Sequence, residues 1–276
     1  IISGGAKIIS FLYSMRNSPI GIFDSGVGGL TIYEEIHKLL PHENIIYLAD
    51  SKNAPYGEKS KEEIIHISVK NTEFLLSKEC KLIVVACNTA STNAVKYLRE
   101  HYSIPFIRVQ PAIKPAALNS KTKVVGILAT KSTLKSELLF ETSQRFAQGV
   151  KVVEQVGEGL VTLIESGKMH SSEMTNLLHK HIDPMLDDNI DHLVLGCTHY
   201  PFLTDQIKEI VGKEVDILDS GEAIARQTKV ILKEENLLNP ETGMIKRLFY
   251  TNKDPQVMQQ ILDEFDEGFE AIKTNF

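Results

Sequence analysis

The feature that most constrains the fold is a regular alternation of short apolar segments with longer amphipathic ones. Apolar segments at 20–23, 45–48, 82–86 and 106–109 are separated by longer stretches, several of which show the apolar spacing of a helix. Short strands that alternate with helices predict parallel βαβ units, so the expected fold class is α/β. In such sheets the functional residues lie in loops beyond the carboxyl ends of the strands.

The same pattern occurs twice along the chain. Segments 83–89 and 193–199 each form an apolar strand that ends in a small residue, a cysteine and two polar residues. Upstream, the apolar segments 20–25 and 125–130 occupy matching places. We therefore expect two similar three-layer lobes with mostly parallel sheets, related by pseudo-twofold symmetry. The strand ends of both lobes would then meet at a cleft between them.

The repeat also predicts how the chain is divided. The first lobe is expected to span 15–111 together with 222–276, because the C-terminal segment is too short for a third domain. The second lobe is expected to span 112–221. Residues 1–14 are interpreted as an extension, because Met15 stands just before a sequence that resembles a natural start. They lack a convincing secretory signal, so we expect a cytoplasmic location.

Charge and hydropathy argue against two classes of partner. The formal net charge is -6, and Lys and Arg are scattered rather than clustered with aromatic residues. A nucleic-acid surface needs a basic patch, so no nucleic-acid partner is expected. No apolar run approaches the roughly 18–20 residues that a membrane-spanning helix requires, so no membrane partner is expected either.

Two cysteines carry the chemical hypothesis. Cys87 and Cys197 occupy matching positions in the repeat, so their thiols would face each other across the cleft. Taken alone, each is interpreted as a buried small side chain, but the matched positions favour catalysis. Inverting a stereocentre by proton transfer needs a base on one face and an acid on the other. A thiol, with an ordinary pKa of about 8.5, can serve in either role. Cys80 has no polar motif around it and is expected to be structural.

Polar groups beside the thiols complete the predicted site, and no cofactor is expected. Asp24 and His199 could poise the two thiols, and each cysteine precedes a predicted helix whose N–H groups could stabilise a thiolate. No Cys/His cluster has zinc spacing, so no metal is expected. The glycine-rich segment 26–29 lacks the third glycine of a dinucleotide loop and the lysine of a P-loop. The donors available for a carboxylate are the backbone of 25–29 and the side chains of Asn88, Thr89 and Thr198.

Together, several motifs resemble those of the bacterial glutamate racemases, within the aspartate/glutamate racemase superfamily. The matching segments are 21–31, 55–57, 87–91, 195–201 and 219–221, in the order that the family has them. The resemblance implies a two-lobed, pyridoxal-independent isomerase that supplies D-glutamate for peptidoglycan, and hence for cell-wall biogenesis and cell shape. Dimers are common in the family, so a homodimer is expected.

The resemblance also implies roles for individual residues. The thiol that matches Cys87 takes the α-proton from D-glutamate, and the one that matches Cys197 takes it from L-glutamate. Asp24 and His199 match assisting groups, and Glu165 matches a further one, although this chain has Gly-Glu where relatives often have Cys-Pro upstream of it. The positions that match substrate-binding residues are Asp24, Ser25, Pro55, Tyr56, Gly57, Cys87, Asn88, Thr89, Cys197, Thr198 and His199.

Three alternatives stay open from the sequence. An aspartate racemase would share the fold and the thiol pair, but those enzymes tend to have Glu where this chain has His199. A two-lobed small-ligand binding protein without catalysis would need no matched thiols. A dithiol redox protein would usually place its cysteines close together in sequence.

Overall fold

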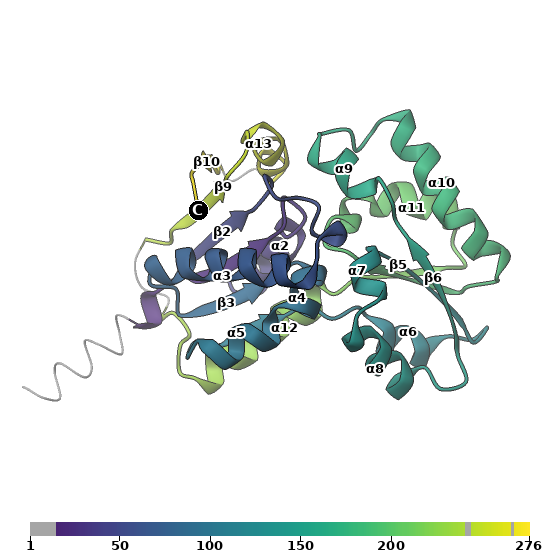
Figure 1. Cartoon of the computed structure of the whole chain (residues 1–276), viewed down its shortest axis with the longest axis horizontal. Coiled ribbons are helices and arrows are strands. Elements are labelled where there is room, and N and C mark those ends of the chain that lie inside the picture. The colour runs from purple at the N-terminus through teal and green to yellow at the C-terminus, as the bar shows by residue number, and fades with distance from the viewer. Residues whose placement is uncertain (1–14, 241–243, 266–267) are drawn as a thin grey trace, which may run out of the picture.

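The computed structural model describes residues 15–240, 244–265 and 268–276. They form two α/β lobes that lie next to each other, each built around its own parallel sheet (Figure 1). The expected α/β class and two-lobed architecture are therefore confirmed. The interpretation of residues 1–14 as an extension falls outside the described residues.

The sheet of the first lobe has the strand order β10-β9-β2-β1-β3-β4, with neighbouring strands parallel. Every residue of its three central strands β2, β1 and β3 is buried, because helices cover both faces of the sheet. Its strands are β1 (Ile20–Asp24), β2 (Ile45–Ala49), β3 (Leu82–Val85), β4 (Phe106–Arg108), β9 (Arg247–Thr251) and β10 (Ala271–Lys273).

Helices from both ends of the chain enclose this sheet. On one face, side chains of α2, α12 and α13 share a hydrophobic cluster with alternate residues of the strands. On the other face, α3, α4 and α5 form a second cluster. These helices are α2 (Leu30–Leu39), α3 (Lys61–Ser77), α4 (Asn88–Asn93), α5 (Val95–His101), α12 (Gly221–Glu234) and α13 (Gln256–Asp263).

The sheet of the second lobe repeats the core of the first. Its order β6-β5-β7-β8 has the same topology as β2-β1-β3-β4. Strand β3, which precedes Cys87, pairs with β1, and β7, which precedes Cys197, pairs with β5. Helices α9, α10 and α11 cover one face and α6 and α8 cover the other. The strands are β5 (Val124–Ala129), β6 (Lys151–Val156), β7 (His192–Gly196) and β8 (Asp216–Leu218). The helices are α6 (Ile113–Asn119), α7 (Lys131–Leu134), α8 (Glu137–Phe146), α9 (Leu160–Glu165), α10 (Ser172–Asp187) and α11 (Thr204–Val211).

The C-terminal segment belongs structurally to the first sheet. Helix α12 packs along α2, and β9 pairs with the edge of β2, which places the C-terminal segment beside β2 and the loop that follows it. The sequence pattern predicts a short strand at 247–250, and the structure has β9 there, whereas nothing in the pattern predicted β10. The exact lobe boundaries 15–111 plus 222–276 and 112–221 stay predictions.

One expected helix is divided in two. The periodicity predicts a helix over about 91–101, but the structure has α4 and α5 with a break at Ala94. Near the break, the side chains of Thr92 and Asn93 both donate to the carbonyl of Thr89, at 3.0 and 2.8 Å. Such side chains compete with backbone N–H groups for the helix carbonyls, which explains the short first helix.

A buried ion pair supports the amino ends of the first sheet's strands. Lys81 Nζ lies 2.5 Å from Glu43 Oε2, and both side chains are almost completely buried. The other carboxylate oxygen of Glu43 accepts a hydrogen bond from the Asn239 N–H at 2.9 Å. Burial of this kind requires that both charges stay paired.

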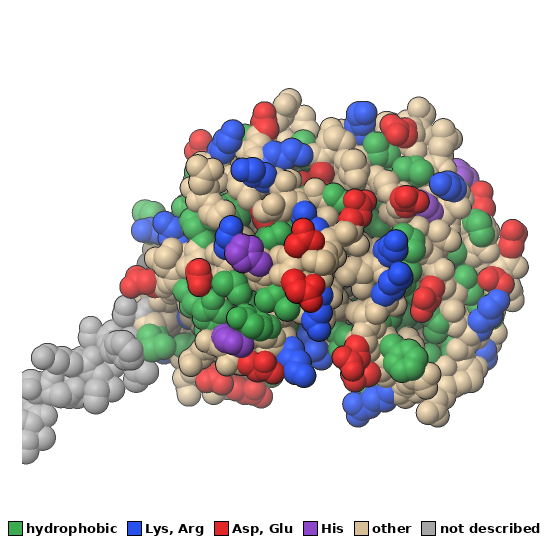
Figure 2. Space-filling model, viewed as in Figure 1, with side chains coloured by type: hydrophobic (Ala, Val, Ile, Leu, Met, Phe, Trp, Pro, Cys, Tyr) green, Lys and Arg blue, Asp and Glu red, His purple; other side chains and the backbone are tan. Residues whose placement is uncertain are grey.

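The surface carries charges of both signs. On the face shown in Figure 2, acidic and basic side chains are interspersed over both lobes. Among the described helices, none combines the length and the apolar character that crossing a bilayer requires.

Candidate active site

The candidate site lies where the loops after β1, β3, β5 and β7 meet between the lobes. Hydrogen bonds join these loops across the interface: Thr198 donates to Asp24, Val27 N–H donates to Glu165, and Thr89 and Thr130 are joined through their hydroxyls. The repeat therefore brings both strand-end cysteines to one region of the molecule. Both are free thiols and almost fully buried.

Cys87 is held at the N-terminus of α4. Its sulfur accepts a hydrogen bond from the Ala90 N–H at 3.5 Å and lies 3.6 Å from Ser25 Oγ. Burial raises the pKa of the Cys87 thiol well above its usual range, and the nearby Asp24 carboxylate raises it further. The helix N–H and Ser25 lower the pKa, as expected, but they do not offset these two effects. Cys87 is therefore favoured as a neutral thiol, which suits a proton donor.

Cys197 has a different neighbour. It follows β7, and its sulfur lies 3.8 Å from Nδ1 of His199. Burial lowers the pKa of His199, but hydrogen bonds and charges from Cys197 and Glu165 raise it well above the ordinary value. The protonated imidazole therefore places a positive charge beside the sulfur of Cys197. The charged neighbour of Cys87 is thus an acidic group, Asp24, and that of Cys197 is a basic group, His199.

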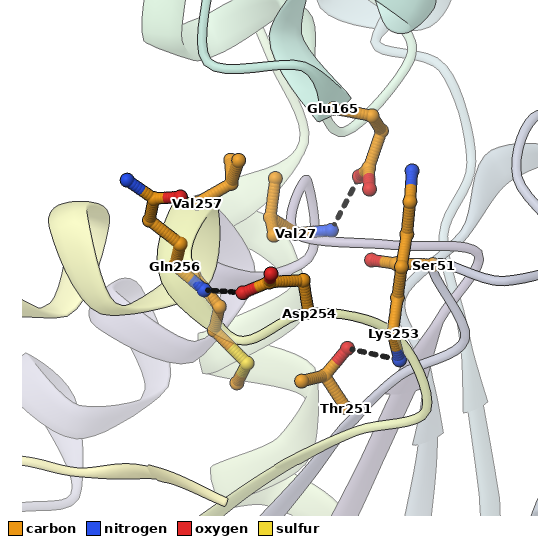
Figure 3. Close-up of a pocket in the computed structure, with 9 residues that line it drawn as sticks. Val27, Ser51, Glu165, Thr251, Lys253, Asp254, Gln256 and Val257 are labelled. Carbon is orange, nitrogen blue, oxygen red and sulfur yellow. Dashed lines mark hydrogen bonds between the residues drawn. The ribbon is translucent and has the colours of Figure 1, made fainter. Parts of the chain in front are cut away.

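Glu165 completes the environment of His199 and contacts the first lobe. It ends α9, and its Oε1 lies 2.7 Å from His199 Nε2 and accepts a 2.7 Å hydrogen bond from Val27 N–H. Burial raises the pKa of Glu165, but the hydrogen bond and charge of His199 and the Val27 N–H outweigh it, so the pKa is lowered. The two side chains therefore form a buried ion pair. Figure 3 shows Glu165 directed at the Val27 N–H.

The glycine-rich loop after β1 makes this contact possible. A Cβ at Gly26 would lie 1.9 Å from Glu165 Oε1, and one at Gly28 would lie 2.3 Å from His199 Nδ1. No side chain fits at either position while these two groups stay in place. Glycine at these two positions therefore admits a carboxylate and an imidazole of the other lobe.

Asp24 is the buried carboxyl group between the two thiol environments. Its Oδ2 accepts hydrogen bonds from Gly29 N–H at 2.7 Å and from Thr198 Oγ1 at 3.2 Å. Burial raises its pKa, and the charge of His199 lowers it less strongly. A carboxyl group with a raised pKa can hold or release a proton close to the working pH of an enzyme.

The loop at residues 54–57 lies beside Cys87, although its tyrosine does not present a free hydroxyl there. Tyr56 packs in the same hydrophobic cluster as Cys87, and its Oη donates a 2.5 Å hydrogen bond to Asp50. The Ala54–Pro55 peptide is cis, and Gly57 packs against Thr130 of the second lobe. The loop therefore forms a wall of the site through its backbone and the buried ring.

Asn88 presents a donor without a protein partner. Among the described residues, no group accepts a hydrogen bond from its buried side-chain Nδ2. Asn88 lines a small pocket together with Thr31, Cys197, Thr198 and Ser220. A buried unpaired donor costs about 1–3 kcal/mol, and a ligand carboxylate would satisfy it.

Thr130 is a site residue that the sequence reasoning missed. Its hydroxyl lies 3.0 Å from the hydroxyl of Thr89, and it also caps α7. The repeat matches 129–130 with 24–25, so the equivalence of Thr130 with Ser25 could have revealed it. Asp50, by contrast, lies in a polar loop without a counterpart in the repeat.

A second cavity adjoins the other side of Glu165. Its volume is about 130 Å³, and it lies between Glu165, the loops after β1 and β2, and the start of α13 (Figure 3). Its lining residues are Val27, Ser51, Glu165, Thr251, Lys253, Asp254, Gln256, Val257 and Met258. Within the described residues, no three His, Cys, Asp or Glu side chains are arranged to hold a metal ion.

Comparison with known proteins agrees with this geometry. The family model of Asp/Glu/Hydantoin racemases matches residues 20–228, which include both cysteines. The chain belongs to the Asp/Glu/Hydantoin racemase family. It is an enzyme of the amino-acid racemase class, and the family match ends before β9.

Individual members of the family resemble the chain over most of its length. A glutamate racemase of Herpetosiphon aurantiacus is 48% identical over 241 residues, which cover 87% of this chain and 95% of that protein. A solved glutamate racemase isoform from Bacillus anthracis has a TM-score of 0.85 at 31% identity, covering 95% of this chain and 98% of that one. The Escherichia coli glutamate racemase, solved with L-glutamate and an activator, has a TM-score of 0.81 at 34% identity, covering 92% and 97%.

Proposed function

We propose that this racemase interconverts L- and D-glutamate by two-base proton transfer at the α-carbon, without a cofactor, using Cys87 and Cys197. The observation that carries the proposal is the placement of two buried thiols at the ends of the matched strands β3 and β7. They are near enough for the charge of Cys197 to raise the pKa of Cys87. The glutamate racemases among the relatives support the choice of substrate.

The path of the protons follows from the groups that surround the two thiols. From L-glutamate, the Cys197 thiolate removes the α-proton, and its charge is balanced by the protonated His199. The resulting carbanion takes a proton from the Cys87 thiol on its opposite face and becomes D-glutamate. One C–H bond breaks and another forms, so the step ends with a thiol at Cys197 and a thiolate at Cys87. The reverse reaction, from D-glutamate, restores the starting state.

Asp24, His199 and Glu165 assist the thiols in this proposal. Glu165 keeps His199 protonated, and His199 in turn favours the Cys197 thiolate. Asp24, with its raised pKa, would exchange a proton with the Cys87 side of the site. Substrate would be held at the remaining predicted positions, with the Asn88 amide donating to a carboxylate. These positions are Ser25, Pro55, Tyr56, Gly57, Asn88, Thr89 and Thr198.

The proposal extends to the cellular role. The D-glutamate formed would supply peptidoglycan synthesis in the cytoplasm, and the enzyme would act as a homodimer. These points rest on the resemblance to glutamate racemases. An aspartate racemase remains the alternative activity of the same family, and His199 after the second thiol motif favours glutamate over it.

Proton NMR in D2O tests the function directly. Purified protein with reduced thiols and no added cofactor is incubated with L-glutamate and, separately, with L-aspartate. We expect α-proton exchange and loss of optical rotation with glutamate alone. Exchange with aspartate alone would assign the rival activity, and no exchange with either, from folded protein, would support a binding protein.

Three cysteine variants then test the mechanism. Cys87→Ser and Cys197→Ser should each abolish sustained racemisation, because one face of the substrate loses its acid/base group. Cys80→Ser is the matched control, since Cys80 is also a buried free thiol but lies outside the site. Near wild-type racemisation by either of the first two variants would refute the two-thiol mechanism.

A further inference from the structure

Asn252 links the C-terminal segment to a loop of the candidate site. It directly follows β9, beyond residues 20–228 that the family model matches, and it is 9% exposed. Its side-chain Oδ1 accepts a 2.9 Å hydrogen bond from Lys52 N–H, and its Nδ2 donates to Asp50 Oδ1. Both ends of one amide therefore hold the loop that follows β2.

The group that Asn252 contacts is a buried carboxylate surrounded by neutral donors. Asp50 is 1% exposed and accepts hydrogen bonds from Tyr56 Oη at 2.5 Å and from Asn53 Nδ2 at 2.8 Å. Within the described part of the chain, no Lys, Arg or His forms an ion pair with it. A buried carboxylate without a cation depends on each donor that it has, so the Asn252 amide has a large share in orienting it.

The orientation of Asp50 reaches the site through Tyr56. The Tyr56 hydroxyl is held between Asp50 and the Asn71 amide, and its ring packs in the cluster that contains Cys87. The next residue, Gly57, packs against Thr130 of the other lobe. Movement of this loop would therefore alter both the wall beside Cys87 and the contact between the lobes.

We propose that Asn252 is a positioning residue: its side-chain amide holds the Asp50–Tyr56 pair and thereby fixes the loop at residues 54–57, which forms a wall of the site. This inference rests on the proposed racemisation of glutamate. It assigns to the C-terminal segment, which the motifs of the family do not include, a part in completing the active site. Asn252 acts on binding through the loop and touches none of the reacting atoms.

Asn44 provides a matched control at the opposite end of the same strands. Its Nδ2 donates to the Asn17 carbonyl at 2.7 Å, and its Oδ1 accepts from Lys246 N–H at 2.7 Å. Like Asn252, it donates one hydrogen bond and accepts one between the C-terminal segment and the N-terminal part of the lobe, but it lies before β2 and donates to a backbone carbonyl. Asn44→Ala should lower Tm while leaving the kinetics unchanged.

Steady-state kinetics in both directions separate positioning from stability. We expect Asn252→Ala to raise KM for both enantiomers roughly tenfold, the loss typical of one hydrogen bond to a charged group, while kcat changes less than about threefold. In a Tyr56→Phe background, the same substitution should have less than about twofold further effect, because the path through Tyr56 is already broken. Wild-type KM in Asn252→Ala, or fully additive effects in the double variant, would overturn the proposal.

Hydrogen exchange tests, without substrate, whether the Asn252 side chain clamps the loop after β2 through its hydrogen bonds to Lys52 and Asp50. Amides of residues 51–57, apart from Pro55, which has no N–H, should exchange roughly tenfold faster in Asn252→Ala than in the wild type, and at the wild-type rate in Asn44→Ala. Unchanged exchange in Asn252→Ala would overturn the proposal even if the wild type racemises glutamate. If the wild type lacks that activity, the proposed function fails and the positioning role falls with it, whereas faster exchange would still establish the clamp.

Asn252→Asp gives a second test with little change in shape. The introduced carboxylate still accepts from Lys52 N–H, but it repels Asp50 at a distance where two carboxylates resist ionising together. A proton shared between them at lower pH restores a donor. The ratio of variant to wild-type KM should therefore be several-fold larger at pH 9 than at pH 6. A ratio that does not change with pH would contradict the proposal.

Discussion

Replacing Glu165 by Gln would test whether the carboxylate charge of Glu165, through His199, promotes proton transfer by Cys197. Glu165→Gln preserves the shape of the side chain and an oxygen for Val27 N–H, which now binds Oε1 at 2.7 Å. It removes the negative charge that lies 2.7 Å from Nε2 of His199. The imidazole would then lose part of its preference for the protonated form, and the Cys197 thiolate would lose its balancing cation.

The size of the effect follows from the hydrogen bond that changes. Hydrogen bonds that involve a charged group contribute about 1.5–3 kcal/mol, and a bond between two opposite charges lies near the upper end of that range, whereas one from a protonated imidazole to a neutral amide lies near the lower end. The protonated imidazole is thus stabilised less by about 1–1.5 kcal/mol in the variant. Because about 1.4 kcal/mol corresponds to a factor of ten in rate, kcat/KM should fall roughly five- to twelvefold.

The assay must allow for the symmetry of the reaction. The two enantiomers have equal free energies, so kcat/KM falls by the same factor in both directions for any variant. The side of the defect appears instead in the primary isotope effect with α-deuterated substrate. This effect should grow for L-glutamate, whose deuteron Cys197 would remove, and shrink for D-glutamate, because removal of its deuteron by Cys87 would then limit the rate less.

The control is an exposed carboxylate on the loop that precedes α9. Glu158→Gln makes the same change of charge at an exposed position, and it should leave kcat/KM within about twofold of the wild type. If Glu165→Gln also stays within twofold, the ion pair has no part in poising Cys197. A larger isotope effect for D-glutamate alone would show that Glu165 assists the Cys87 side instead.

Two further predictions concern stability. Lys81→Met leaves a buried carboxylate unpaired, which costs about 3–5 kcal/mol, so Tm should fall by roughly 6–15 °C. Lys38→Met removes an exposed ion pair between Lys38 and Glu34 on one helix, and it should lower Tm by less than about 2 °C in the same scan. Equal falls in Tm for Lys81→Met and Lys38→Met would contradict the role of burial. The stabilisation from Glu165, whose pKa is lowered, is full above its ordinary pKa of 4.5 and is lost as the pH falls. The stabilisation from His199, whose pKa is raised, is full below its ordinary pKa of 6.5 and is lost as the pH rises. In urea unfolding, the free energy of unfolding of Glu165→Gln should therefore fall furthest below that of the wild type between pH 4.5 and 6.5. A deficit that keeps growing up to pH 9 would contradict this assignment.

Local sequence patterns predicted most of the first lobe's strands and helices. The strands expected at 20–23, 45–48, 82–86 and 106–109 agree with β1 to β4 within one residue, because uninterrupted apolar runs mark strands buried on both faces. The break at Ala94 was missed, because it depends on side chains that bond to a backbone carbonyl rather than on periodicity. Strand β10 was missed because it lies at the sheet edge, where burial imposes less pattern.

The candidate site was predicted in part for a similar reason. The repeat placed both cysteines at strand ends, and that inference needed only local spacing. The direction of the Cys87 pKa shift could not be obtained in this way. A helix N-terminus suggested stabilisation of the thiolate, but burial and the Asp24 charge, which act through space, raise the pKa instead.

The sequence by itself determined the α/β class, the twofold repeat and the equivalence of Cys87 with Cys197, because each is carried by the order and spacing of neighbouring residues. Tertiary structure alone decided that Glu165 meets His199 and the glycine loop, and that Asn252 meets Asp50. Those partners lie far apart along the chain, and a hydrogen bond or a pKa depends on distance and dielectric in space. Sequence spacing reports which faces are buried, and only the folded chain determines what they are buried against.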